Sequence, residues 1–308
     1  NITVIRTIQS LKRTRTWQGL ASLIQKTRST DAMQELEWEG MQMFTDHGVP
    51  QDDPRLAGVY SHYEDNLTDI IETLQGKGMR VLLSSVPVNL RHSAPFLSVR
   101  SPNLSKERLD QWRAATRSGA ESAAAGNWDD AVTQFRAALE IDPEYADTHF
   151  RLATALENLG DYQEARTHFE RALDLDALRF RADTRINRII RDIADGAEDD
   201  LLSFVDSAAA FEHASQPFQP GWNLLLEHVH YDFAGNHVLA AEISGSIVNN
   251  LAADDNLPLW LGGFSFGGFI AVQAAAELGP RRLVVVAPAV NYFPDQAVGL
   301  RDTDWLLI

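Results

Sequence analysis

The chain has 308 residues, 44% of them hydrophobic and 23% charged, a composition typical of globular proteins, with enough length for about two domains. Its 27 Lys and Arg residues against 43 Asp and Glu residues give a net charge of −16, which repels phosphate backbones and argues against nucleic acid as a partner. The chain contains no cysteine, which excludes disulfide bonds, thiolate nucleophiles and cysteine-bound zinc.

Nothing in the sequence predicts a membrane span or a signal peptide. No stretch approaches the roughly 18 consecutive apolar residues that a span needs, and the first residues are too basic and too interrupted for the apolar region of a signal peptide. The basic run from Arg6 to Arg28 is interpreted as the solvated face of a helix rather than as a nucleic-acid arm. Because the chain begins at Asn1 rather than Met, a leader or anchor further upstream stays open, and so does localisation.

The N-terminal part predicts two helices followed by a strand. Apolar residues recur at helical spacing from Ser10 to His47 and again from Val59 to Leu74. A glycine turn then leads into residues 79–87, an apolar, β-branched run closed by proline. A helix, a tight turn and a short buried strand together form one unit of a parallel sheet.

The loop after this strand contains three candidate site residues, Asn89, Arg91 and His92. Open α/β sheets place ligands at the carboxyl ends of their strands, which is where this loop begins. The alternative is that these side chains only cap and satisfy the backbone of the loop. The sequence leaves both interpretations open.

An internal repeat occupies the middle of the chain. The segment from Gly126 to Ala131 (GNWDDA) recurs from Gly160 to Ala165 (GDYQEA), and ALEID at 138–142 recurs at the same offset as ALDLD at 172–176. Glycine permits a tight turn between antiparallel helices, and the small alanines allow the helices to approach closely. This pattern resembles the tetratricopeptide repeat, whose helix pairs generally bind peptides or mediate subunit contacts; the alternative is a purely structural insertion. Two repeats are fewer than a free-standing array needs, so a flanking domain is expected to cover their ends.

A second helix and strand follow the repeats. Residues 179–190 are rich in arginine but keep Phe180, Ile186 and Ile190 on one side, which predicts an amphipathic helix. After a glycine break, residues 201–206 predict a strand that ends in an acid. A further helix is predicted over Val238–Leu251.

Just ahead of that helix, residues 226–237 (LEHVHYDFAGNH) contain three histidines, two carboxylates and a Gly-Asn turn. Glu227 and His230 stand three residues apart, so the carboxylate can orient the imidazole, which can then take a proton from a nucleophile. This is the base half of a hydrolytic triad; the alternative is a polar loop whose histidines cap the following helix. No metal site is predicted, because His228, His230 and His237 are expected to have polar roles at the surface.

The C-terminal stretch predicts a strand, a sharp turn and a helix around a serine. Residues 257–268 (LPLWLGGFSFGG) contain G-x-S-x-G centred on Ser265. Glycines let Ser265 occupy a strained turn as a nucleophile, and the amide of Phe266 is the expected oxyanion donor. A helix over 269–278 and a strand over 282–288 are predicted next. This arrangement resembles the nucleophile elbow of an α/β-hydrolase.

Residues 1–252 resemble the SGNH (GDSL-like) hydrolase superfamily, in particular bacterial members that carry a tetratricopeptide insertion. The residues that carry the likeness are 86–90, 94–96, the repeats, 178–183, 227–230 and 235–236. The resemblance implies a serine nucleophile, glycine and asparagine oxyanion donors and a D-x-x-H block, which reads E-x-x-H here. Its nucleophile and oxyanion blocks would lie upstream of Asn1.

The fold class predicted from these resemblances is α/β: an incomplete three-layer α/β/α SGNH-like domain with an α-helical tetratricopeptide insertion, plus a partial α/β-hydrolase unit of strand, elbow, helix and strand. The expected domains are residues 1–105 and 179–253 for the two parts of the SGNH-like domain, 106–178 for the insertion and 256–308 for the α/β-hydrolase-like fragment. The change of pattern near residues 252–256 predicts that two incomplete hydrolase domains are joined there, by gene fusion, by a change of reading frame or by assembly of sequence fragments.

The predicted function is that of a serine-type ester or acyl hydrolase acting on a small ester or acylated substrate, with Glu227 orienting His230 as the base. Because its own nucleophile would lie upstream of Asn1, the chain is expected to be inactive as it stands. No cofactor and no metal are predicted. The alternative is a non-catalytic interaction module whose repeats bind a peptide or protein partner on a hydrolase scaffold.

Overall fold

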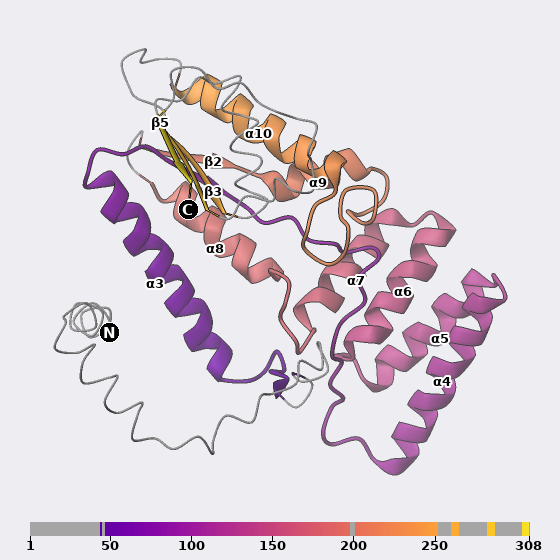
Figure 1. Cartoon of the computed structure of the whole chain (residues 1–308). Helices are drawn as coiled ribbons and strands as arrows, with labels where there is room; N and C mark the ends of the chain where they lie inside the picture. Colours follow the sequence, from indigo (N-terminus) through magenta and orange to yellow (C-terminus); the bar gives the residue numbers. More distant parts are fainter. Residues whose placement is uncertain are drawn as a thin grey trace, which may run out of the picture. The chain divides into compact units, whose positions relative to one another are not determined.

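The computed structural model describes residues 44, 47–197, 201–251, 260–264, 282–286 and 304–307 (Figure 1). The chain divides into two compact units, residues 1–46 and residues 47–308, and nearly all described residues belong to the second. The predicted site residues Ser265 and Phe266 lie outside the described residues, as does almost all of the first predicted helix. Among the described helices, none has the length and apolar character that crossing a membrane requires.

Two short strands pair although the repeats separate them in sequence. Helix α3 (Arg55–Gln75) leads into β1 (Val81–Ser84), as the helical spacing and the glycine turn predict. Strand β1 pairs in parallel with β2 (Leu202–Val205), and α3 and α8 (Thr184–Asp195) pack against this sheet. The buried residues at this contact are Ile71, Leu83 and Ile190.

Aspartate caps decide where two helices begin. The Asp183 carboxylate accepts a hydrogen bond from the Ile186 N–H at 3.0 Å, so α8 begins at Thr184 rather than at the predicted Arg179. In the same way Asp206, the acid expected at the end of the second strand, caps α9 (Ser207–Ser215), a helix that the sequence pattern did not predict.

The last described helix, α10 (Phe233–Leu251), begins earlier than the predicted Val238. Its first turn is fixed by Asp232, whose carboxylate accepts a hydrogen bond from the Gly235 N–H at 2.8 Å. Gly235 and Asn236 therefore belong to the first turn of a helix, and the predicted Gly-Asn turn is wrong. Helix α10 packs against α9 and β2.

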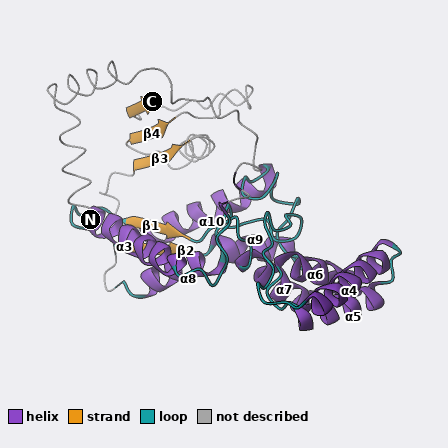
Figure 2. Ribbon diagram, turned by 90° about the horizontal axis from the view of Figure 1, so that it is seen from below, coloured by secondary structure: helices purple, strands orange, loops and turns teal. Residues whose placement is uncertain are grey.

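Between the two paired strands the chain forms four helices, which we call the repeat region: α4 (Lys106–Ala124), α5 (Trp128–Ile141), α6 (Ala146–Leu159) and α7 (Tyr162–Asp174). Successive helices pack against each other (Figures 1 and 2). Gly126 and Gly160, at equivalent positions of the two repeats, follow α4 and α6 with φ of 77° and 85°. Glycine adopts this left-handed conformation without steric cost, which explains why the repeat places glycine at both turns.

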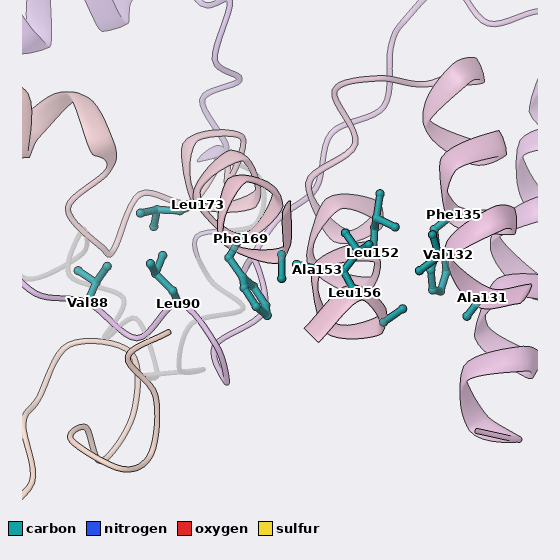
Figure 3. Close-up of a cluster of buried hydrophobic side chains, with 12 residues drawn as sticks. Val88, Leu90, Ala131, Val132, Phe135, Leu152, Ala153, Leu156, Phe169 and Leu173 are labelled. Atoms are coloured by element: carbon teal, nitrogen blue, oxygen red, sulfur yellow. The ribbon is translucent and has the colours of Figure 1, made fainter. Parts of the chain in front are cut away.

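The core of the repeat region is made of small and large apolar side chains that alternate across the helix contacts. Ala131 and Ala165, the alanines that the repeat predicts at close helix contacts, are 0% and 1% exposed. Figure 3 shows the buried cluster, which includes Val88, Leu90, Ala131, Val132, Phe135, Leu152, Ala153, Leu156, Phe169 and Leu173. Val88 and Leu90 come from the loop after β1, so that loop contributes to the core of the repeats.

The predicted three-layer α/β/α fold is wrong. The described residues are mostly helical, and the sheet that β1 and β2 form has two strands. Most of the buried apolar residues lie at the helix contacts of the repeat region rather than on the faces of a sheet. The helix, turn and strand units were predicted correctly because they are local, whereas the number of strands in a sheet depends on contacts between distant segments.

Three further strands form a parallel sheet of their own in the order β3 (Trp260–Phe264), β4 (Arg282–Val286) and β5 (Asp304–Leu307). Strands β3 and β4 lie where the sequence predicts strands on either side of the serine motif. A short parallel sheet occurs in many folds with unrelated activities, so these strands do not identify a hydrolase.

Candidate functional site

The outer face of the first helix pair of the repeat region is polar. Along α4 exposed side chains recur every three or four residues, which places them on one face of the helix. This face includes Lys106, Asp110, Arg113, Ala114, Arg117 and Glu121, and α4 also exposes Glu107, Arg108, Gln111 and Ala124. A terminal repeat needs such a polar outer face because no further helix covers it.

Another side of the repeat region is covered by residues 88–101, which we call the covering segment. Near the end of α6, the Arg91 Nε donates to Glu157 Oε1 at 2.7 Å. Near the start of α6, the Ser98 hydroxyl accepts from the Asp147 N–H at 2.9 Å. The covering segment therefore runs along α6 in the opposite direction to the helix.

Two aspartates at equivalent positions of the repeat bind the covering segment. Asp142 and Asp176, which end ALEID and ALDLD, are 0% and 2% exposed. Asp142 accepts from the Ser101 hydroxyl at 2.7 Å, and Asp176 accepts from the backbone N–H groups of Phe96 and Leu97 at 2.9 and 3.1 Å. Each repeat thus ends in a buried carboxylate that holds an extended piece of chain.

A buried ion pair at the end of the repeat region binds the covering segment. Arg181 lies 3.2 Å from Asp176, and the two side chains are 2% and 3% exposed. Arg181 also donates to the carbonyl oxygens of Asn89 and Ser93 at 2.8 and 2.7 Å. Because a buried charge is costly without partners, these contacts require the covering segment to stay in place.

The predicted pair of Glu227 and His230 lies in residues 220–236, which we call the histidine loop. The Glu227 carboxylate accepts from the backbone N–H groups of His228 and His230, both at 2.7 Å, and contacts the ring Nδ1 of each. Burial acts to raise the pKa of Glu227, but the hydrogen bonds from His230 and His228 outweigh it and lower that pKa. The carboxylate is therefore charged at neutral pH.

His230 has one ring nitrogen on this carboxylate and most of its ring in solvent. Its side chain is 75% exposed, and the structure gives its Nε2 no partner among the described residues. An imidazole oriented by a carboxylate and open at Nε2 has the geometry of a general base. The described residues contain no group of three His, Asp or Glu side chains placed to hold a metal ion.

Asn89 connects the covering segment to the histidine loop. It is 0% exposed, its Nδ2 donates to the Glu227 carbonyl oxygen at 2.9 Å, and its backbone N–H donates to the His228 carbonyl oxygen at 3.1 Å. Its Oδ1 accepts from the His92 N–H at 2.8 Å. All the polar atoms of this side chain are therefore used to hold backbone.

Arg91 and His92 lie at the same contact. The Arg91 guanidinium stands 3.9 Å from the centre of the Phe218 ring while its Nε binds Glu157. His92 Nδ1 accepts from the Trp222 N–H at 3.1 Å, and the two rings are stacked with centroids 4.4 Å apart. Burial and the nearby Arg91 charge lower the pKa of His92, so its ring is neutral at neutral pH.

One stretch of the chain is similar to a known repeat family. Residues 122–183 match the tetratricopeptide repeat model. The match covers the end of α4, all of α5, α6 and α7 and the turn up to Asp183, which confirms the resemblance that the repeated glycines and alanines carry. No curated protein and no solved structure matches the chain. The resemblances to SGNH and α/β-hydrolases gain no support from these comparisons.

The residues that join the tetratricopeptide repeats to the histidine loop were not predicted. Asp176 and Arg181 hold the covering segment, and Trp222 stacks on His92. One signal was present in the sequence: an aspartate recurs at the end of ALEID and ALDLD. Both repeats therefore place a carboxylate at the same position, directly after apolar residues. The covering-segment partners of Arg181 and Trp222 lie 88 or more positions away along the chain, so no local pattern identifies them.

Proposed function

We propose that this protein is a protein-interaction module whose repeat region binds a peptide or protein partner. The observation that carries the proposal is the tetratricopeptide match over residues 122–183. The buried Asp142 and Asp176 support it, because each already holds an extended segment of the chain through hydrogen bonds. A repeat region with these groups is suited to binding extended polypeptide.

The exposed face of α4 is the surface that we assign to the partner. The covering segment occupies the side of α6, whereas Ala114 and its neighbours on α4 remain exposed. On this face the basic Lys106, Arg113 and Arg117 outnumber the acidic Asp110 and Glu121 by one. Asp110 pairs with Arg113 at 3.4 Å with both side chains more than half exposed. Exposed ion pairs stabilise little, so these charges are free to meet an acidic partner segment.

Photo-crosslinking from this face tests the proposal. A photoreactive amino acid in place of Ala114, in cells that make the protein, is expected to crosslink to a partner polypeptide. The control position is Asp65, an exposed residue of α3, from which no such product is expected. Reversal of charge in Arg117→Glu should remove the product. Equal products from both positions, or no product from position 114, would contradict the assignment.

We also propose ester hydrolysis as a second candidate function, because of the contact between Glu227 and His230. In this proposal Glu227 orients His230, which takes the proton from a nucleophile attacking a small ester or acylated substrate. Ser265, with the Phe266 amide as oxyanion donor, is the candidate nucleophile of the separate α/β-hydrolase-like motif and is not paired with His230 in this proposal. Asn89, Arg91 and His92 would then hold the loop that carries the base.

Turnover of a p-nitrophenyl ester tests this second function. Turnover that depends on the Glu227 and His230 pair is expected to be lost in His230→Ala, whereas Ser265→Ala and His237→Ala, the latter at an exposed histidine on α10, should leave it unchanged. Loss in Ser265→Ala alone would remove His230 from the mechanism. No turnover by the unaltered chain would leave the interaction module as the function.

A further inference from the structure

The three most exposed large hydrophobic side chains of the described residues lie within one short stretch of the chain. Trp222, Leu226 and Phe233 are 64%, 68% and 70% exposed. Exposed apolar residues scattered singly are normal on a protein surface, but several together mark an interaction site. All three belong to the histidine loop.

The loop places each of the three residues near one short bridge. Leu225 and Tyr231 form an antiparallel bridge, and each of the three exposed residues is within three positions of one end of it. At 3.8 Å between consecutive Cα atoms, each therefore lies within about 11 Å of the bridge. Leu224 and Leu225 are buried against Phe211 beneath it, so the loop is anchored while its apolar side chains remain in solvent.

Trp222 is fixed in its orientation. Its backbone N–H donates to His92 Nδ1 at 3.1 Å, and its indole stacks on the His92 ring with 6° between the planes. One face of the indole is covered in this way, and the side chain still exposes 64% of its surface. An aromatic ring held in place loses little entropy on binding, which is why tryptophan is frequent at the energetic centre of interfaces.

The charged side chains of the loop itself are acidic, and Arg91, which lies beside the loop, is paired with Glu157. No Lys or Arg occurs between Arg191 and Arg281. Within residues 201–251 the acids are Asp206, Glu212, Glu227, Asp232 and Glu242. Arg191 pairs with Asp206 and Arg166 pairs with Glu212, but Glu227 and Asp232, which lie in the loop itself, have no Lys or Arg partner among the described residues.

We propose that the histidine loop is a docking surface for a basic amphipathic segment of another protein. The apolar side chains of that segment would pack on Trp222, Leu226 and Phe233, and its Lys and Arg side chains would meet Glu227 and Asp232. A cation over the open face of the indole adds to the attraction. The surface and the charge of its partner both differ from those of α4, so this inference goes beyond the proposed function and does not rest on it.

Binding of a designed peptide to the full chain tests the proposal. The probe is a fluorescein-labelled peptide of Leu and Lys, about 18 residues long, with Leu at helical spacing; the reference peptides have Glu in place of Lys, or the same composition in scrambled order. Fluorescence anisotropy is expected to detect binding of the basic amphipathic peptide alone, weakening as salt is added.

Matched variants locate the binding surface. Leu226→Ser, Phe233→Ser and Trp222→Ala are each expected to weaken the affinity about tenfold, the effect of losing one central anchor. The controls Val59→Ser and Ile70→Ser remove hydrophobic side chains of α3 that are 55% and 57% exposed, and they should change the affinity less than about twofold. Unchanged urea midpoints would show that all variants fold.

Four results would overturn the proposal. They are equal weakening by the α3 controls, equal binding of the acidic peptide, a dimer in sedimentation that Phe233→Ser dissociates, and binding of uncharged phosphatidylcholine vesicles without binding of the peptide. The third assigns the surface to a second copy of this chain, and the fourth assigns it to lipid. None of them bears on crosslinking from α4, so the two proposals fail separately.

Discussion

The repeat region and the histidine loop touch the same covering segment but are stabilised by different interactions. In the repeat region the buried residues are mainly alanine, leucine and phenylalanine, packed at the contacts of four helices. The histidine loop is held by side chains that bind backbone, such as Asn89 with the Glu227 carbonyl oxygen and Glu227 with the N–H groups of its own turn. The stability of the repeat region therefore depends on how well its apolar side chains fit together, and that of the histidine loop depends on its hydrogen-bond partners.

The difference explains how the two regions respond to change. Apolar packing is made of many weak contacts, so losing one costs the transfer energy of a few atoms. A buried polar group that loses its partner keeps its full desolvation cost. We therefore expect the effects of single substitutions at polar contacts of the covering segment and histidine loop to exceed those at the helix ends of the repeat region.

The largest effect is expected for Arg181→Ala, which leaves the buried Asp176 without its cation and two carbonyl oxygens without a donor. Removing one partner of a buried ion pair costs about 3–5 kcal/mol in the free energy of unfolding, measured by urea denaturation. The control Arg185→Ala removes an exposed arginine stacked on Tyr60 and should cost less than about 1 kcal/mol. Similar losses in both variants would refute the role given to the buried pair.

The next effect concerns a polar exception inside the repeat region. His149 and His168 face each other with their Nδ1 atoms 2.8 Å apart, and His149 Nε2 lies 2.9 Å from the Pro143 carbonyl oxygen. That carbonyl requires a proton on His149 Nε2, so in the neutral ring Nδ1 accepts from His168. Burial, with the His168 charge, lowers the pKa of His149 from 6.5 to about 4 although the Pro143 carbonyl acts to raise it.

This shift makes stability depend on pH. Because the folded chain binds the proton more weakly than the unfolded chain, the contribution is complete above pH 6.5 and is lost as pH falls towards 4. At about 1.4 kcal/mol per pKa unit, the loss is on the order of 3 kcal/mol. In His149→Gln the fall in urea midpoint between pH 7 and pH 4 should be smaller; an equal fall would place the titrating group elsewhere.

A third test compares two glycines of α10. An added Cβ at Gly235 would lie 2.1 Å from the Leu224 carbonyl oxygen, whereas at Gly245 it would meet nothing within 4 Å. Gly235→Ala should therefore cost about 1–3 kcal/mol by overpacking, and Gly245→Ala should gain up to about 1 kcal/mol from helix propensity. If thermal unfolding gave stability changes of the same sign for the two variants, the close approach of Leu224 to Gly235 would not be needed for stability.

The smallest effect is expected at equivalent positions of the two repeats. Asp161 caps α7 by accepting from the Glu164 N–H at 3.1 Å, whereas Asn127, its counterpart in the first repeat, makes no side-chain cap bond to α5. Asp161→Ala should cost about 1 kcal/mol, and Asn127→Ala only a few tenths. If calorimetry gave equal costs, the cap bond would not be what stabilises the second repeat.

Regular periodicity is what made part of the fold predictable. The recurrence of Gly126 as Gly160 predicted the helix turns, and the apolar runs predicted α3, β1 and β2 because each depends on neighbours in sequence. Helix starts were less predictable, since no local pattern distinguishes the capping Asp183 and Asp232 from aspartates that only face solvent. The spacing of Glu227 and His230 correctly predicted that the two side chains meet.

By itself the sequence determined the repeats, their turns and the contact of Glu227 with His230, because each arises from residues within a few turns of one another. Only the tertiary structure decided how many strands pair with β1, that Asp142 and Asp176 hold the covering segment, and that Arg181 and Asn89 connect it to the rest. These contacts join residues far apart in the chain, and forming them requires long loops to close against their conformational entropy. No local sequence pattern encodes such contacts.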